Sequence, residues 1–359
     1  MKKIVIISLL ILFAGGFFYK MYLDSQLESS DANAATFTFQ ENLAVVKNKE
    51  AKIEIKISNT KITMLELKLN DSTLQKWSNP KGIVSHNFVS KNQLLGTKKL
   101  SLIATLADNS IENDERLLRI LNDKKPETWS LEVNKEFPHR NLSYTQGLEF
   151  YNNELFEGTG DPNSKGQTLL AKVDVSTGNL TKQIGLDNTH FGEGITVIND
   201  IVYQLTWKNE KCLTYNSSDL SVLKKEHHYS GEGWGLCNDG KYLIMSNGTE
   251  QLVFRDPNTF KVIKTIEATT NEGTITQLNE LEYIDGLIYA NVYMQDIIAV
   301  INPNDGGVIA IIQASDISTK YRGTGEVLNG IAYNKSDNQI YITGKYWNKL
   351  LGVKIKKAV

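Results

Sequence analysis

Residues that bind soft metals or form cross-links are scarce in this sequence. The 359 residues include 2 cysteines and 5 histidines, which argues against a zinc site built from thiolate and imidazole ligands. Cys212 and Cys237 are too few for a disulfide framework, and the sequence agrees equally with one bridge or two free thiols. The formal net charge of −2 gives no general attraction to polyanions, so we expect no nucleic-acid partner.

Long apolar runs are lacking beyond the first 23 residues. Two lysines precede an apolar run at residues 4–18, which is the form of an export signal. The run is short for a spanning helix unless residues 19–23 extend it. A cleavage-type sequence, ANA at 32–34, lies far from the run, so for residues 1–23 we favour a signal anchor over a cleaved signal peptide. Either one exports the chain to the periplasm or cell surface, and the anchor attaches it to the inner membrane through residues 4–23.

A linker and a strand-rich region come next. Residues 24–35 (DSQLESSDANAA) are small and polar, as in a linker. Residues 36–124 hold several short alternating segments, and one of them, KIEIKIS, places isoleucines on one face and lysine and glutamate on the other. This pattern predicts an immunoglobulin-like β-sandwich. No ionisable cluster or glycine-rich loop stands out in this region, so we interpret it as a spacer or docking module.

Residues 128–359 contain five related segments, TQGLEF, GEGITV, GWGLCN, NELEYI and NGIAYN. In each, small or polar residues lead into an apolar position, and these positions recur every 41 to 50 residues, at Leu148, Ile195, Leu236, Leu281 and Ile331. A repeat of this length with several strands per unit is typical of propeller blades. The region therefore predicts an all-β fold, a five-bladed β-propeller, in which WSLEVNKEF (129–137) completes the last blade and closes the ring.

Equivalent positions of the five lead-ins are expected to meet at one mouth of the propeller, because the first strand of each blade lines the axis. They are Gln146, Glu193, Trp234, Asn279 and Asn329. Glu193 is unusual, since it stands between Gly192 and Gly194 with aromatic residues nearby in the sequence. Burial in such a pocket would raise its pKa into the range useful for proton transfer. The alternative is a solvated glutamate in a surface turn.

Other residues near the predicted mouth have structural alternatives. Glu280 and Glu282 are two positions apart and share one face of a strand, where hydrogen bonding to the backbone explains them as well as chemistry does. Lys345 is either a pocket residue or an ordinary surface lysine. Trp207 and Trp234 are either pocket walls or blade packing.

Several motifs carry a family resemblance. In order along the chain they are FPHRNLSYTQGLEF, LFEGTG, FGEGITV, YQLTWK, GEGWGL, LNELEY, ANVY, VLNGIAY and TGKYW. Together they closely resemble the plant-type glutaminyl cyclases, the glutaminyl-peptide cyclotransferases of papaya latex and many bacteria, over about residues 130–355. The resemblance implies a five-bladed propeller as the catalytic domain. It also implies a reaction in which the N-terminal glutamine of a peptide or protein becomes pyroglutamate and ammonia is released.

The resemblance assigns roles to individual residues. Glu193, the acid of FGEG, falls on the family's catalytic position. Roles in substrate binding fall on Tyr144, Gln146, Glu157, Phe191, Trp207, Trp234, Asn279, Tyr293 and Lys345. Two of these depart from the family pattern, because Glu157 stands in FEGT where the family has FEST, and Tyr293 stands where it often has tryptophan.

The reaction suits a single positioned carboxylate. The α-amine must lose a proton to attack the side-chain carboxamide, and the leaving nitrogen must gain one, so one carboxylate can act as base and then as acid. The resemblance implies that no metal is required, although a structural calcium ion is sometimes found at the ring centre in this family. Two other functions are compatible with the residues: a non-catalytic propeller that binds peptides or glycans at the cell surface, and a metal-dependent hydrolase.

Overall fold

The computed structural model describes residues 33–40, 42–163, 167–223 and 226–357, which fall into two compact units. The first unit takes in the chain as far as residue 118, except two short segments, 45–49 and 90–97, that cluster with the second unit. The predicted signal and most of the predicted linker lie outside the described residues. In the part of the chain that is described, no helix is long and apolar enough to cross a membrane.

Two sheets lie in the N-terminal part of the chain. One has the order β1-β3-β6, formed by Ala35–Phe37, Glu50–Ile57 and Ile83–Val89. The other has the order β2-β8-β7-β4-β5, formed by Leu43–Val46, Ile111–Leu121, Gly96–Leu106, Ile62–Leu69 and Ser72–Ser78. In β3, Ile53 and Ile55 are fully buried while the charged residues between and around them are not, as the alternating pattern predicts.

The second unit is built from antiparallel sheets that follow one another along the chain. Three of them have four consecutive strands each. The first is β10–β13 (Tyr144–Tyr151, Glu154–Gly160, Leu169–Val173, Leu180–Gly185). The second is β14–β17 (Gly192–Ile198, Ile201–Thr206, Lys211–Asn216, His227–His228). The third is β18–β21 (Leu236–Asn238, Leu243–Ser246, Gln251–Arg255, Val262–Glu267).

A larger sheet of eight strands completes this unit, in the order β22-β23-β24-β25-β9-β28-β27-β26. Strands β22–β25 are Leu278–Ile284, Leu287–Val292, Ile297–Ile301 and Val308–Gln313, and β26–β28 are Leu328–Asn334, Gln339–Gly344 and Lys349–Lys356. Strand β9 (Glu127–Pro138) comes from the start of the unit, pairs antiparallel with β28 and also runs parallel to β25. This pairing confirms that WSLEVNKEF completes the sheet formed by the last strands of the chain.

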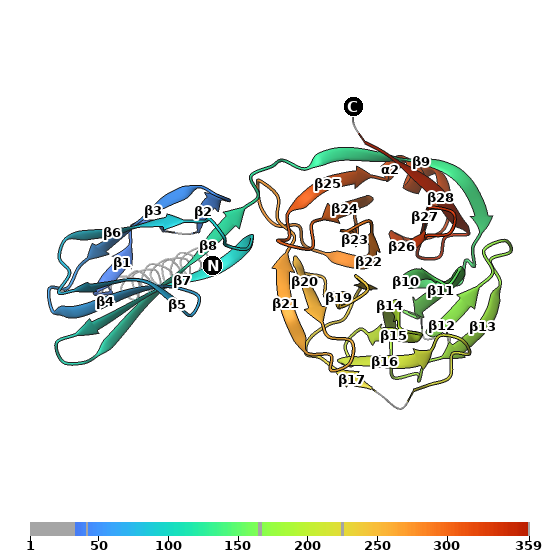
Figure 1. Cartoon of the computed structure of the whole chain (residues 1–359), viewed down its shortest axis with the longest axis horizontal. Coiled ribbons are helices and arrows are strands. Elements are labelled where there is room, and N and C mark those ends of the chain that lie inside the picture. Colours follow the sequence, from blue (N-terminus) through green and yellow to red (C-terminus); the bar gives the residue numbers. More distant parts are fainter. Residues whose placement is uncertain (1–32, 41, 164–166, 224–225, 358–359) are drawn as a thin grey trace, which may run out of the picture. The chain divides into compact units, whose positions relative to one another are not determined.

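The sheets are arranged around a common axis, with their first strands innermost (Figure 1). Neighbouring first strands β10, β14, β18, β22 and β26 contact one another around that axis. The apolar residues of the five lead-ins lie on these strands, and each is about 1% exposed: Leu148, Ile195, Leu236, Leu281 and Ile331. The fold of this unit is therefore β-propeller-like, as the repeat predicts.

Tight turns set the register of several inner hairpins. Both central residues of these turns have positive φ angles, as in Asn152–Asn153 (49° and 65°), Asn199–Asp200 (52° and 60°) and Asp285–Gly286 (49° and 85°). Turns of this kind match the twist of the flanking strands, and Asn, Asp and Gly tolerate the left-handed conformation best. The turns therefore help to fix which residues of β10, β14 and β22 reach the mouth.

One helix in the described part of the chain was not predicted. It is α2 (Ser315–Tyr321), between β25 and β26. Asp316 in its first turn and Lys320 in its last turn both complement the helix dipole, and Ile317 and Ser318 are buried. A single seven-residue helix with a serine and threonine content this high shows almost no helical periodicity, which explains why sequence reasoning missed it.

Trp129 lies at the start of β9, where this strand pairs with β25, and we predict a large energetic role for it. This residue is 4% exposed and belongs to the same buried cluster as Ile312 and Leu351. Replacing Trp129 by alanine is expected to lower the free energy of unfolding by about 3 to 5 kcal/mol, because the cavity opens at the junction of the first and last strands. Urea denaturation measures this loss. Glu132→Ala, an exposed change on the same strand, is the control and is expected to leave the midpoint unchanged.

Candidate active site

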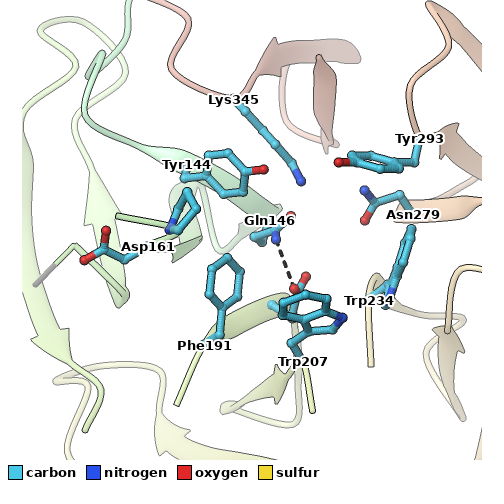
Figure 2. Close-up of a pocket in the computed structure, with 11 residues that line it drawn as sticks. Tyr144, Gln146, Asp161, Phe191, Trp207, Trp234, Asn279, Tyr293 and Lys345 are labelled. Atoms are coloured by element: carbon cyan, nitrogen blue, oxygen red, sulfur yellow. Dashed lines mark hydrogen bonds between the residues drawn. The ribbon is translucent and has the colours of Figure 1, made fainter. Parts of the chain in front are cut away.

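A pocket of about 430 Å³ opens at one mouth of the propeller-like unit (Figure 2). Its lining residues are Tyr144, Gln146, Asp161, Pro162, Phe191, Glu193, Trp207, Trp234, Asn279, Tyr293 and Lys345. All of the residues assigned to catalysis or substrate binding by the family resemblance are in this set except Glu157. Residues from every part of the propeller-like unit therefore converge on one site.

Irregularities in the inner strands aim the polar side chains at the pocket. The pairing register shifts between Thr145 and Gly147, between Gly192 and Ile195, and between Leu278 and Leu281. The residues skipped by these shifts include Gln146, Glu193 and Asn279, all pocket residues. A β-bulge leaves such residues outside the regular ladder and re-aims their side chains. The sequence alone showed the lead-in segments, but it did not show that three of them contain β-bulges.

The two glycines beside Glu193 are required by close backbone contacts. A Cβ atom on Gly194 would lie 2.5 Å from the amide nitrogen of Leu236, and one on Gly192 would lie 2.7 Å from the carbonyl oxygen of Thr159. Gly194 also donates its N–H to the carbonyl oxygen of Trp234 at 2.7 Å. The FGEG sequence therefore allows β14 to approach both neighbouring strands while its carboxylate turns toward the pocket.

Glu193 is buried, with 4% of its surface exposed. Its Oε1 accepts a hydrogen bond from Nε2 of Gln146 at 3.0 Å, drawn as the dashed line in Figure 2. Burial raises the pKa of Glu193 well above its usual range, the charge of Lys345 opposes this rise, and the charge of Glu232 adds to it. The carboxyl group therefore holds its proton more strongly than a glutamate in water does.

Asn329 lies beneath the pocket and not on its surface, which corrects the expectation that it joins the other four lead-in residues at the mouth. Its Nδ2 donates to the carbonyl oxygen of Thr145 at 2.9 Å and to Oε1 of Gln146 at 3.4 Å. Because the Gln146 oxygen faces this donor, its Nε2 is turned toward Glu193. Asn329 thus orients the amide that holds the carboxylate, and its burial removes it from the pocket.

Lys345 is 2% exposed and follows strand β27. Its Nζ lies 4.4 Å from the ring centre of Tyr144 and 5.2 Å from that of Tyr293, positions suited to cation–π attraction. Burial lowers the pKa of Lys345 to about 8, against the opposing charges of Glu193 and Glu326. Burial therefore outweighs the mutual attraction of Lys345 and Glu193, and both shift toward their neutral forms.

Aromatic rings form the walls of the pocket. Phe191 lies edge-on to Tyr144 with ring centres 6.2 Å apart and edge-on to Trp207 at 5.7 Å. Trp234 and Tyr293 make a similar contact at 5.5 Å. Such pairs hold each other in fixed orientations. Tyr293, where the family often has tryptophan, keeps a flat wall in this position.

Asn279 brings an unsatisfied amide to the pocket. It is 2% exposed, and within the described part of the chain its Oδ1 has no hydrogen-bond partner. A buried carbonyl oxygen without a donor is unfavourable, and the oxygen belongs to a pocket-lining side chain. It is therefore available to accept a hydrogen bond from a bound molecule.

Glu157 does not reach the pocket, which corrects the expectation that it binds substrate. Its side chain is fully buried, and its two oxygens accept hydrogen bonds from Ser143, Thr145 and His139. Because these partners occupy the carboxylate and no surface is exposed, Glu157 cannot contact a ligand directly. It instead supports the start of β10, the strand that carries Tyr144 and Gln146 to the site.

His139 and Glu157 form a buried ion pair behind this strand. The ring nitrogens of His139 face two acceptors, the carbonyl oxygen of Trp347 at 2.9 Å and Oε1 of Glu157 at 3.0 Å, so both nitrogens carry protons. Burial alone would lower the pKa of His139, but the Glu157 carboxylate raises it overall. Burial alone would raise the pKa of Glu157. The charge of His139 and the hydrogen bonds that Glu157 accepts outweigh burial, so the pKa of Glu157 is lowered overall.

Acids at the ring centre are engaged by the backbone. The oxygens of Glu280 accept N–H groups from Leu148 and Ile331, on two other inner strands, and Glu282 accepts that of Tyr333. Burial is the main cause that raises the pKa of both acids well above the usual range. Across the described ranges no group of three or more His, Cys, Asp or Glu is placed to hold a metal.

The structure also places residues that sequence reasoning treated differently. Asp161 and Pro162 line the pocket, although the sequence analysis assigned no role to either residue. Nothing in their pattern pointed inward, because these two residues reach the mouth only once the sheets are assembled. Cys212 and Cys237 are both free and buried, which resolves the two alternatives that the sequence allowed.

The ion pair behind β10 predicts a specific loss of stability. Glu157→Gln or His139→Gln is expected to lower the free energy of unfolding at neutral pH by about 3 to 5 kcal/mol, because each leaves a buried partner without its opposite charge. The double variant is expected to lose less than the sum of the two. Since the pKa of Glu157 is depressed on folding, its contribution is present at neutral pH and is lost as the pH falls through the folded value.

Urea denaturation across pH measures this difference. Equal losses at pH 7 and at strongly acidic pH, or strictly additive losses in the double variant, would show that the two residues do not act as an ion pair.

Comparisons with known proteins identify the family to which the chain belongs. A family model described as glutamine cyclotransferase matches residues 100–355. The chain is 40% identical over 234 residues to a glutaminyl-peptide cyclotransferase of Arabidopsis thaliana, covering 64% of this chain and 72% of that protein. The crystal structure of Myxococcus xanthus glutaminyl cyclase has a TM-score of 0.61 and 30% identity, and it covers 66% of this chain and 100% of its own. The chain belongs to the glutamine cyclotransferase family.

Proposed function

We propose that the pocket around Glu193 converts the N-terminal glutamine of a peptide or protein to pyroglutamate with release of ammonia. One observation carries the proposal: a buried carboxyl with a raised pKa, held by Gln146, faces a buried lysine inside an aromatic pocket. A site that only bound peptides would gain nothing from a desolvated acid in this position, since such a group is costly to bury.

Proton transfer is the part that we assign to Glu193. The neutral α-amine nitrogen of the substrate bonds to the side-chain carboxamide carbon, and the carbonyl electron pair moves onto the oxygen. As this bond forms, the nitrogen becomes acidic and the ionised carboxylate takes one of its protons. The protonated carboxyl returns that proton to the amide nitrogen, the carbon–nitrogen bond breaks, and ammonia leaves. The proton that leaves the amine is thus the one that the leaving nitrogen receives, and Glu193 ends in its starting state.

Stabilisation of the carboxamide oxygen is assigned to Lys345, with Asn279 holding the substrate amide. Negative charge develops on this oxygen when the ring closes, and a buried ammonium group in a site of low polarity stabilises it strongly. The unpartnered Oδ1 of Asn279 is suited to accept an N–H of the substrate. Gln146 keeps Glu193 oriented throughout.

The aromatic walls are proposed to hold the substrate folded. Ring closure joins two groups of the same residue, so restricting the glutaminyl side chain to a bent conformation removes much of the entropic barrier. Flat rings that line the pocket, Phe191 with Trp207 and Trp234 with Tyr293, suit the methylene groups of that side chain and exclude water.

We also propose a finer description of the architecture. The eight-stranded sheet is best counted as two blades of four strands, β22–β25 and β26–β28 with β9, which together with the three four-stranded sheets gives five blades over residues 128–359. Residues 36–124 are proposed to form an immunoglobulin-like sandwich, supported by their two sheets. Residues 1–23 are proposed to export the enzyme to the periplasm or cell surface, and whether they remain as an anchor is a prediction from sequence.

The proposal predicts that Glu193→Gln abolishes cyclisation. The rate constant kcat is expected to fall by about 100- to 10,000-fold, because the amide can neither accept nor return the proton. Mass spectrometry of a peptide that begins with glutamine measures the loss of ammonia. Glu282→Gln, which changes another buried acid outside the pocket, is the matched control and is expected to retain activity.

Wild-type protein that folds but never releases ammonia from such peptides would contradict the proposal and favour a binding function. We propose that no metal is required, so a chelator is expected to leave the rate unchanged. Loss of activity after a chelator is added would favour a metal-dependent reaction.

The shifted pKa values predict a bell-shaped pH profile of kcat/KM. Activity is expected to rise with pH as Glu193 loses its proton, above the usual range of a glutamate, and to fall as Lys345 loses its proton around a pKa of about 8. Lys345→Arg keeps a positive charge at all working pH values, so the alkaline fall is expected to disappear or move upward. An alkaline limb that stays in place in this variant would show that another group controls it.

A further inference from the structure

We infer that Glu232 is a positioning residue that fixes two tryptophans of the pocket wall through a single carboxylate oxygen. Its Oε2 accepts the indole N–H of Trp207 at 2.7 Å and that of Trp234 at 2.9 Å. Figure 2 shows the two indoles next to each other on one side of the pocket. The inference rests on the proposed function only for the identity of the substrate that these rings enclose.

The shared oxygen links neighbouring sheets. Trp207 directly follows strand β15, and Trp234 lies just before β18, so the two rings belong to consecutive sheets of the propeller-like unit. An indole N–H can only donate, and its ring can pivot about the side-chain bonds unless that donor is held. Two donors converging on one acceptor therefore fix both rings relative to each other, and with them the width of the pocket on this side.

The backbone around Glu232 holds the carboxylate in place. Gly231, with φ of 86°, donates its N–H to Oε1 of Glu210 at 2.7 Å. Gly233 donates its N–H to the carbonyl oxygen of Trp207 at 3.0 Å. A Cβ atom on Gly233 would lie 2.2 Å from the hydroxyl of Tyr229, so the chain needs glycine to pass this ring. Glu232 is therefore anchored on both sides by main-chain contacts.

Glu232 stays ionised in this position. Burial alone would raise its pKa, but the hydrogen bonds from Trp234 and Trp207 and the charge of Lys208 lower it overall. Nζ of Lys208 lies 3.7 Å from the other carboxylate oxygen and 4.0 Å from the ring centre of Trp207. The acceptor is thus charged, which strengthens both hydrogen bonds.

The charge of Glu232 also acts on Glu193. The ionisable groups that influence Glu193 or are influenced by it come from several elements: Glu232 before β18, Lys345 after β27, Tyr144 on β10 and Tyr229 after β17. Of these, Glu232 brings negative charge near neutral pH and Lys345 brings positive charge. Removing the negative charge is expected to make Glu193 easier to ionise.

Two substitutions separate the positioning effect from the charge effect. Glu232→Gln keeps an oxygen acceptor for the indoles but removes the charge. It is expected to leave KM within about twofold of wild type and to move the acid limb of the pH profile down by a few tenths of a unit. Glu232→Ala removes both, and it is expected to raise KM by about tenfold with a smaller effect on kcat, because the loosened rings bind the substrate less well.

The experiment measures kcat and KM for a glutaminyl peptide across pH, together with acrylamide quenching of tryptophan fluorescence. Quenching is expected to increase in Glu232→Ala and not in Glu232→Gln. Glu226→Ala, which removes an exposed acid paired with Lys211, is the matched control and is expected to resemble wild type in every readout. In a double-mutant cycle with Trp207→Phe, Glu232→Ala is expected to raise KM much less than it does in the wild-type background.

An unchanged KM, unchanged quenching, or a fully additive cycle in Glu232→Ala would overturn the inference. If Glu232→Ala does not fold, the test uses the pH profile of kcat/KM of Glu232→Gln. An acid limb at the wild-type position in this variant overturns the effect of the Glu232 charge on Glu193. Failure of the proposed function is distinguishable, because wild type would then form no pyroglutamate, whereas the quenching readout reports on the indoles without any reaction.

Discussion

Burial of one carboxyl group is the constraint on which the site depends. Glu193 leaves the regular ladder of β14 at a bulge, between glycines that permit close contact with strands on either side. Removing a carboxylate from water is unfavourable, and the structure offsets this with one amide, Gln146, and one lysine at a distance. The surrounding sheets support this arrangement, since each pocket residue comes from an inner strand, from the strand paired with it, or from a loop that adjoins one of these strands.

Support for the site extends into layers that never touch a ligand. Asn329 orients Gln146, the His139–Glu157 pair holds the start of β10, and Glu232 fixes the two indoles. Each of these groups forms hydrogen bonds to other protein atoms and lines no part of the pocket, so its influence on a substrate is indirect. Such supporting contacts determine how precisely a catalytic group is placed.

Sequence reasoning predicted the parts of this molecule that repeat and the parts that form motifs. The spacing of the five lead-ins predicted the inner strands, and FGEG with its aromatic neighbours pointed to the pocket. Sequence reasoning failed where the packing of the sheets decides the direction of a side chain. Glu157 sits in a motif that resembles a binding segment, yet its strand pairing turns it toward His139. Asp161 lines the pocket but lies in none of the motifs, and α2 is too short for its periodicity to show.

The most direct test of the account is the ionisation of Glu193 itself. Infrared difference spectroscopy of wild type against Glu193→Gln, titrated with pH, isolates the carbonyl band of this one protonated carboxyl from those of the other buried acids. The account predicts a midpoint well above the ordinary glutamate value of 4.5. This midpoint is expected to coincide with the acid limb of the pH profile of kcat/KM. A midpoint at the ordinary value would contradict it, because an acid ionised like one in water has no special capacity to carry the proton.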